Sequence, residues 1–126
     1  MIMTIIAVPS DHPGGLDAGI GAHFGHCDLY TLVTEENGTI TKVEVIPNVP
    51  HVQGGCLAPV QYLAGNGVNC LIAGGMGFRP LMGFNQVGIK VFYGANAGSV
   101  GEAVKDAIDG KLVEFRQEHT CGGGQH

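Results

Sequence analysis

The chain has 126 residues and a net charge of −5, with six lysines and arginines against eleven aspartates and glutamates. One domain is expected at this length, since domains average ~100–200 residues. The basic residues form no run, so we expect no nucleic-acid partner. No apolar stretch approaches the ~20 residues of a transmembrane helix, and residues 1–9 lack the basic start of a signal peptide. These observations predict a cytoplasmic protein without a membrane partner.

Apolar runs and helical spacing predict strands alternating with helices. In chain order, we expect strands at 4–9, 29–34 and 39–47, a helix at 57–64, a strand at 69–73, a helix at 80–87, a strand at 89–93 and a helix at 99–109. Asn37-Gly38 predicts a hairpin between the second and third strands, because both residues tolerate positive φ. Ser99 and Glu102 form a capping box before the last helix.

This order of elements predicts a three-layer α/β/α fold around a mixed five-stranded sheet. The alternating second half favours parallel strands joined by right-handed crossovers, and the hairpin adds antiparallel strands. We expect one domain over residues 1–113 and a flexible tail, rich in glycine, histidine and cysteine, over 114–126. Glycine-rich loops follow several strands, and loops at the carboxyl ends of parallel strands commonly form the ligand site.

A glycine-rich turn joins the strand at 69–73 to the following helix. Gly74, Gly75 and Gly77 let backbone N–H groups approach an anion, and Arg79 adds a full positive charge near the helix start. The turn is a poor dinucleotide fingerprint, because Pro80 stands where a third glycine is expected. The turn is therefore interpreted either as an anion site or as a tight strand–helix connection.

Histidine and cysteine cluster in two loops and in the tail. His23, His26 and Cys27 offer nitrogen and sulfur ligands to a soft or borderline metal, although their spacing fits no standard structural zinc motif. His51 precedes Cys56, whose place before a helix favours the thiolate. As alternatives, a histidine in such a loop can simply be hydrogen-bonded, and Cys56 can be a small buried cap residue.

The tail and the remaining cysteine complete the set of candidate ligands. His119 and Cys121 form a short tract of the kind that can bind metal or remain loose at a chain terminus. Cys70 lies inside an apolar strand pattern, so we interpret it as a core residue. Strand 4–8 carries no carboxylate, which disfavours a two-metal nuclease.

The sequence resembles the nitrogenase iron–molybdenum cofactor biosynthesis family, which includes NifX- and NafY-type proteins, the carboxy-terminal domain of NifB and the molybdenum–copper sulfide orange proteins. The resemblance covers residues 3–110. It rests on the opening apolar strand and on four short elements: His23-Phe24-Gly25 before Leu29-Tyr30, Gly74-Gly75-Met76-Gly77, Gly67-Val68, and Gly88-Ile89-Lys90-Val91.

The resemblance implies a ribonuclease-H-like fold that binds or carries a metal–sulfur cluster without catalysis. The implied cargo is a molybdenum–iron, iron–sulfur or molybdenum–copper sulfide cluster, with cluster donor and recipient proteins as partners. It also implies a cluster-binding role for His23. We expect Gly25 and His51 to bind the cluster as well. His26 and Cys27 stand where the family usually has arginine and alanine, so direct metal ligation takes the place of a purely electrostatic contact.

Two further interpretations remain open from the residues alone. One is a small hydrolase or transferase that uses Cys27 or Cys56 as nucleophile and His23 or His51 as base. The other is a partner-binding module in which the histidines are incidental.

Overall fold

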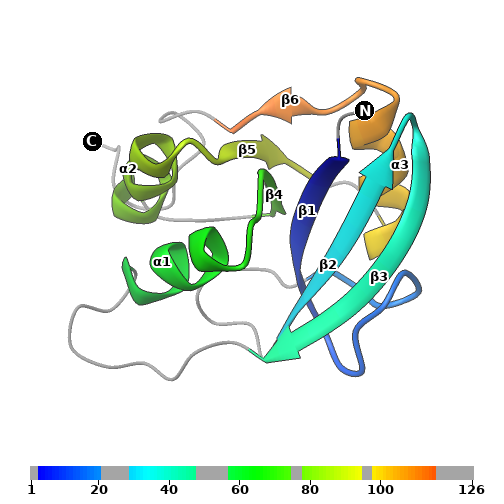
Figure 1. The fold of residues 1–126 in the computed structure, drawn as a ribbon. Coiled ribbons are helices and arrows are strands. Elements are labelled where there is room, and N and C mark those ends of the chain that lie inside the picture. Colours follow the sequence, from blue (N-terminus) through cyan, green and yellow to red (C-terminus); the bar gives the residue numbers. More distant parts are fainter. Residues whose placement is uncertain (1–2, 21–28, 48–56, 75–77, 95–97, 116–126) are drawn as a thin grey trace.

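The chain forms a six-stranded mixed sheet with helices on both faces (Figure 1). The computed structural model describes residues 3–20, 29–47, 57–74, 78–94 and 98–115. The strands are β1 (Met3–Ser10), β2 (Leu29–Glu36), β3 (Thr39–Pro47), β4 (Cys70–Ala73), β5 (Lys90–Tyr93) and β6 (Val113–Glu114). The helices are α1 (Leu57–Gly65), α2 (Phe78–Val87) and α3 (Val100–Ile108).

The strand order in the sheet is β3-β2-β1-β4-β5-β6. Strands β1, β4 and β5 are parallel, and β2 and β3 extend the sheet as an antiparallel hairpin beside β1. This is the ribonuclease-H-like arrangement, so the expected fold class is confirmed.

The sheet has one strand more than the five expected. Strand β6 pairs antiparallel with β5 through two residues, and the backbone N–H of Phe115 donates to the Val91 carbonyl at 2.7 Å. Two residues are too few to show a strand period, which is why the sequence pattern missed this strand. Phe115, which follows β6, has a buried side chain.

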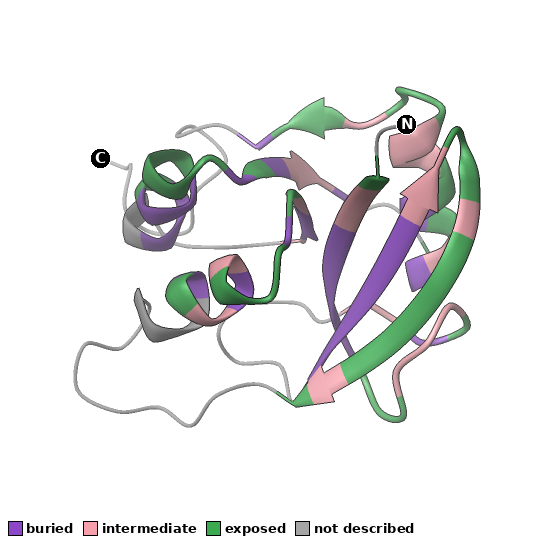
Figure 2. Cartoon of the chain, viewed as in Figure 1, coloured by how far each residue is buried: buried purple, intermediate pink, exposed green. Residues whose placement is uncertain are grey.

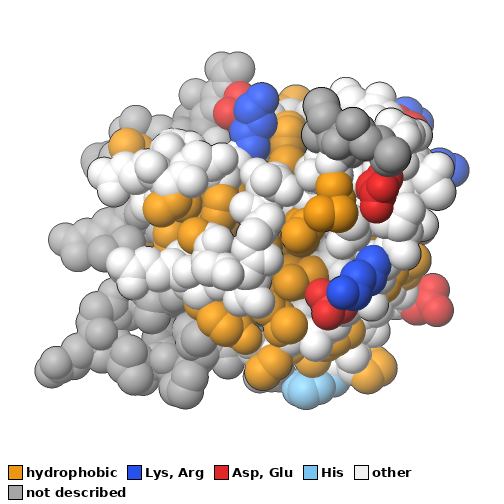
Figure 3. Space-filling model, in the orientation of Figure 1, with side chains coloured by type: hydrophobic (Ala, Val, Ile, Leu, Met, Phe, Trp, Pro, Cys, Tyr) orange, Lys and Arg blue, Asp and Glu red, His pale blue; other side chains and the backbone are white. Residues whose placement is uncertain are grey.

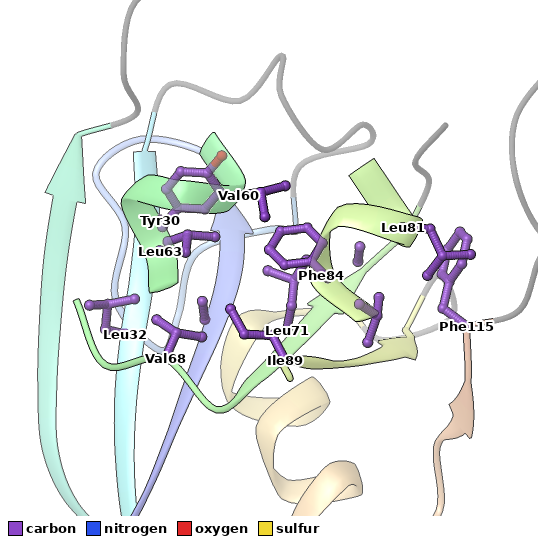
Figure 4. Close-up of a cluster of buried hydrophobic side chains, with 13 residues drawn as sticks. Tyr30, Leu32, Val60, Leu63, Val68, Leu71, Leu81, Phe84, Ile89 and Phe115 are labelled. Atoms are coloured by element: carbon purple, nitrogen blue, oxygen red, sulfur yellow. The ribbon is translucent and has the colours of Figure 1, made fainter. Parts of the chain in front are cut away.

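Two apolar cores hold the three layers together. Helices α1 and α2 pack on one face of the sheet, where Val60, Leu63 and Phe84 contact Tyr30 and Leu71 (Figure 4). Helix α3 packs on the other face, where its buried residues lie against β1, β2 and β4. Burial is greatest along β1 and β2, whereas β3 is exposed at the sheet edge (Figure 2).

Two local sequence signals predicted the observed structure correctly. Asn37 and Gly38 have φ values of 56° and 84°, as a tight hairpin turn between β2 and β3 requires. The Ser99 side chain accepts from the Glu102 N–H at 3.2 Å and so caps α3, while the Glu102 carboxylate accepts from the Gly98 N–H at 3.1 Å. Helix α2 begins at Phe78, two residues before the expected start.

Candidate functional site

The described ends of five strands meet at one edge of the sheet. Ser10 at the end of β1 pairs with Leu29 at the start of β2, which in turn pairs with Pro47 at the end of β3. Strands β4 and β5 run parallel to β1, and their last residues, Ala73 and Tyr93, pair with each other. We call this the loop edge. The carboxyl ends of β1, β3, β4 and β5 therefore face the same side of the domain.

Helices α1 and α2 also begin on the side of the loop edge. Each helix leads into the amino end of the next parallel strand, so both helices run antiparallel to these strands. At the other end of these strands, backbone hydrogen bonds link neighbouring strands: the Asn69 N–H donates to the Ile5 carbonyl at 2.9 Å, and the Lys90 N–H donates to the Asn69 carbonyl at 3.1 Å. The N-termini of α1 and α2, with their partial positive charge, thus lie toward the loop edge.

The loop over residues 11–20 is fixed to the loop edge by two buried hydroxyl groups. Ser10 Oγ donates to the Val8 carbonyl at 2.7 Å and lies 2.8 Å from Thr31 Oγ1, which accepts from the Gly15 N–H at 3.0 Å. Ser10 and Thr31 are both buried. Nothing in the sequence spacing of the two residues marks them as neighbours, so this pair was not predicted.

The same loop caps α3. The carbonyls of Ala18 and Leu16 accept from the N–H groups of Val100 and Gly101, both at 2.8 Å. Together with the Ser99 cap, these bonds satisfy the first N–H groups of α3. Residues 11–20 therefore have a structural role.

Most of the expected site residues lie outside the described residues. These are His23, Gly25, His26, Cys27, His51, Cys56, Gly75, Gly77, His119 and Cys121. Gly74 is described and lies half-buried directly after β4, at the loop edge. Arg79 is the second residue of α2, and its side chain is not described.

The described residues that flank three of these segments are placed by the sheet. Residues 21–28 precede Leu29, residues 48–56 follow Pro47, and residues 75–77 follow Gly74. All three flanking residues lie at the loop edge. Three segments far apart in the sequence are thus attached to one side of the domain.

Cys70 lies at the other end of β4 and belongs to the core. It is half-buried and packs against the cluster under α3, as expected from its apolar surroundings. Burial raises the pKa of the Cys70 thiol, the nearby Lys90 ammonium lowers it and the Glu35 carboxylate raises it. Cys70 is therefore less ready to form a thiolate than an exposed cysteine, which makes it a poorer metal ligand.

The tail departs from the face of α1 and α2. Phe115 packs edge-on against Tyr93, with ring centroids 5.5 Å apart and an interplanar angle of 77°. It also lies beside Leu81 of α2 (Figure 4). His119 and Cys121, which follow, lie outside the described residues.

A group of metal ligands and a membrane-spanning helix are both absent from the described residues. Within residues 3–20, 29–47, 57–74, 78–94 and 98–115, no three histidine, cysteine or acidic side chains group as a metal site. In the same ranges, no helix is long and apolar enough to cross a membrane. The face in Figure 3 carries scattered charges among hydrophobic and uncharged side chains, with no broad patch of one sign.

The fold places the chain in the class of small ribonuclease-H-like α/β domains, in which the ends of several strands meet at one edge of the sheet. The chain belongs to the dinitrogenase iron–molybdenum cofactor family, because the sequence model of that family matches residues 3–110. This confirms the resemblance seen in the sequence.

Individual relatives support the same assignment. The uncharacterized protein MJ0580 of Methanocaldococcus jannaschii is 34% identical over 112 residues, which cover 87% of this chain and 90% of that protein. The apo form of the orange protein from Desulfovibrio gigas is 27% identical, with a TM-score of 0.76 over 90% of this chain and 94% of that chain. The Thermotoga protein TM1290 is 28% identical, with a TM-score of 0.72 over 88% and 92% of the two chains.

Proposed function

We propose that this protein binds a metal–sulfur cluster at the loop edge and carries it between proteins without catalysing a reaction. One observation carries the proposal: the three segments that hold His23, His51 and Gly75 are all attached at the same edge of the sheet. Family membership supports the class of cargo.

The residues near the loop edge have the chemistry that such a cargo needs. Imidazole and thiolate are ligands for iron, copper and other soft or borderline metals, and His23, His26, Cys27 and Cys56 supply both. Exposed sulfides of a cluster accept hydrogen bonds, which tune its properties. Backbone N–H groups in glycine-rich segments are suited to donate these bonds because a glycine has no side chain to keep the cluster away.

Helix α2 adds electrostatic support. A metal–sulfide cluster with net negative charge is stabilised by the N-terminus of a helix, and α2 starts immediately after the segment that contains Gly75 and Gly77. Arg79 brings a full positive charge into the first turn of that helix. We assign Gly74, Gly75, Gly77 and Arg79 to binding the sulfide surface, and His23 and Cys27 to binding metal.

We propose His119 and Cys121 of the tail as further metal ligands. They stand four and six residues after Phe115, and an extended chain spans up to ~3.3–3.6 Å per residue. Because β6 runs antiparallel to β5 and so leads away from the loop edge, the tail must turn back to bring these residues to a cluster there.

The proposed cargo is a molybdenum–iron, iron–sulfur or molybdenum–copper sulfide cluster, received from a donor protein and passed to a recipient in the cytoplasm. A carrier must release what it binds, so a site built from few metal ligands and many weak hydrogen bonds is suitable. A resident cofactor would require a more complete set of protein ligands.

Reconstitution tests the proposal. The full chain is incubated without oxygen with tetrathiomolybdate and Cu(I), or with Fe(II) and sulfide, and is then desalted before metal analysis and visible absorption spectroscopy. We expect a coloured protein with stoichiometric metal. His23→Ala and Cys27→Ser should each reduce retention by about tenfold or more, within the range found for residues that support metal sites.

Cys70→Ser is the matched control, because Cys70 is described and lies at the end of β4 away from the loop edge. It should retain metal as the unmodified chain does. A desalted protein free of metal and colour under both conditions would refute the proposal. Equal retention by the His23, Cys27 and Cys70 variants would refute the assignment of the site.

A further inference from the structure

Strand β3 is a long edge strand, and within the described residues no other strand pairs with its outer side. It stands last in the strand order and spans nine residues, whereas β6 at the opposite edge spans two. Most of its residues are exposed (Figure 2). Val43 and Val45 are 39% and 43% exposed, although both are β-branched residues that strands usually bury. An exposed strand edge offers free N–H and C=O groups to another strand.

The side chains of β3 carry a charge pattern that complements itself. Lys42 and Glu44 lie on the same face of the strand, and Lys42 Nζ is 3.4 Å from Glu44 Oε2. Their side chains are 63% and 52% exposed, so neither is held by the body of the domain. Val43 lies between them and points to the opposite face of the sheet.

We propose that two copies of this chain associate by pairing their β3 strands antiparallel, with the two-fold axis at Val43. In this register Lys42 lies opposite the partner's Glu44, and Glu44 lies opposite the partner's Lys42. Val43 lies opposite the partner's Val43 on the other face. Such an interface is isologous, as a closed dimer requires, and it joins the two sheets into one.

The charges select this register over its neighbours. An antiparallel pair around a two-fold axis keeps side chains of one face together, so the axis passes through a residue of β3. An axis at Lys42 would place two lysines opposite each other, and an axis at Glu44 would place two glutamates opposite each other. Like charges directly opposite are destabilising. Of these three registers, only the one centred on Val43 pairs opposite charges.

The dimer leaves both candidate cluster sites accessible. Pro47 ends β3 at the loop edge, and in the proposed register it lies opposite the partner's Thr39, at the far end of that strand. The two loop edges therefore lie at opposite ends of the joined sheet. A β-bulge interrupts β3 near its start, between Ile40, which pairs with Glu35, and Lys42, which pairs with Thr34. Because the bulge shortens the stretch of regular pairing, the dimer should be weak and concentration-dependent.

Charge exchange tests the proposal by sedimentation velocity over a range of protein concentrations. The unmodified chain should approach twice the 13.0 kDa of one chain as its concentration rises. K42E places two glutamates opposite each other, and E44K does the same with two lysines. Each should raise the dimer dissociation constant by at least about tenfold. The K42E/E44K double variant restores opposite charges and should dimerise again.

Mixing provides the sharper result. An equimolar mixture of K42E and E44K should form a heterodimer, because every cross-strand pair then joins a glutamate to a lysine. K111E is the control: it changes the net charge as K42E does, and Lys111 lies between α3 and the opposite edge strand β6. It should dimerise normally. Since all these side chains are exposed, unchanged circular dichroism would show that folding is intact.

A chain that stays monomeric at every concentration overturns the proposal. So does a dimer that survives both single exchanges, or a mixture that gains no heterodimer, since each result removes β3 pairing as the cause of association.

Discussion

A chain of three hydrogen bonds should make Thr31 one of the most sensitive polar positions of the domain. Ser10 Oγ carries one hydrogen, which it donates to the Val8 carbonyl. The hydrogen between the two hydroxyls must therefore come from Thr31, and Thr31 Oγ1 in turn accepts from the Gly15 N–H. Hydrogen bonds linked in this way polarise one another in a buried setting.

The Thr31→Val substitution keeps the shape of the side chain and removes both bonds of its hydroxyl. The Gly15 N–H loses its acceptor and Ser10 Oγ loses its donor. A buried polar group left without a partner costs ~1–3 kcal/mol, so we expect a loss of about 2 kcal/mol in the free energy of unfolding. Ser10→Ala should cost ~1–2 kcal/mol, because the Thr31 hydroxyl then lacks its acceptor.

Urea unfolding of the single variants and the double variant measures the coupling. The Ser10–Thr31 bond is lost in both single variants, so the double variant should lose about 1 kcal/mol less than the sum of the two. Thr41→Val is the matched control: Thr41 is exposed and its hydroxyl makes only long bonds of 3.3 and 3.4 Å. It should change stability by less than ~0.5 kcal/mol. Additivity of the Ser10 and Thr31 effects, or a Thr31→Val effect no larger than the control, would refute the reasoning.

Three further substitutions test the packing of the domain. Gly94→Ala should lower the free energy of unfolding by ~1–3 kcal/mol, because its Cβ would lie 2.5 Å from Ile72 Cγ2 in the buried core; Gly65→Ala, where a Cβ meets no atom within 4 Å, should not destabilise, and thermal unfolding compares the two. The raised pKa of Cys70 means that the folded state disfavours the thiolate. The contribution of the protonated Cys70 thiol to the free energy of unfolding is therefore complete below the thiol pKa of the unfolded chain, and it is lost as pH rises through the folded pKa. Urea unfolding at alkaline pH should show a smaller decline for Cys70→Ser than for the unmodified chain, and equal declines would contradict the burial of the thiol. Ser99→Ala should destabilise by about 1 kcal/mol through loss of the α3 cap, and an unchanged urea midpoint would show that the loop carbonyls suffice.

The fold was predictable where the physics is local. Asn37-Gly38 fixes the turn between β2 and β3 through the backbone freedom of two residues. Ser99 stops the chain before α3 because its own side chain reaches the Glu102 N–H. Strand β6 was missed because its two residues are held by pairing with β5, a contact that no local pattern records.

The shared edge to which the candidate segments are attached was predictable from the sequence. Alternation of strands and helices implies that the segments after β1, β4 and β5 emerge on one side of the sheet, and the register of Ser10, Leu29 and Pro47 adds the hairpin to that side. The contact between Ser10 and Thr31 was not predictable, since two hydroxyls 21 residues apart give no periodic signal. Side-chain placement depends on such tertiary contacts.

Helix α3 differs from α1 and α2 in what lies at its N-terminus. The first N–H groups of α3 are satisfied by the carbonyls of Leu16 and Ala18 and by the Ser99 side chain, so α3 has no free donors there for a ligand. Helices α1 and α2 begin directly after segments 48–56 and 75–77, which carry candidate residues. A ligand that needs hydrogen-bond donors therefore gains most by binding toward α1 and α2, on the face where Tyr30 and Phe84 fill the core. Loss of the α3 cap should lower stability and leave cluster retention unchanged. A substitution of Arg79 should lower cluster retention and leave stability unchanged.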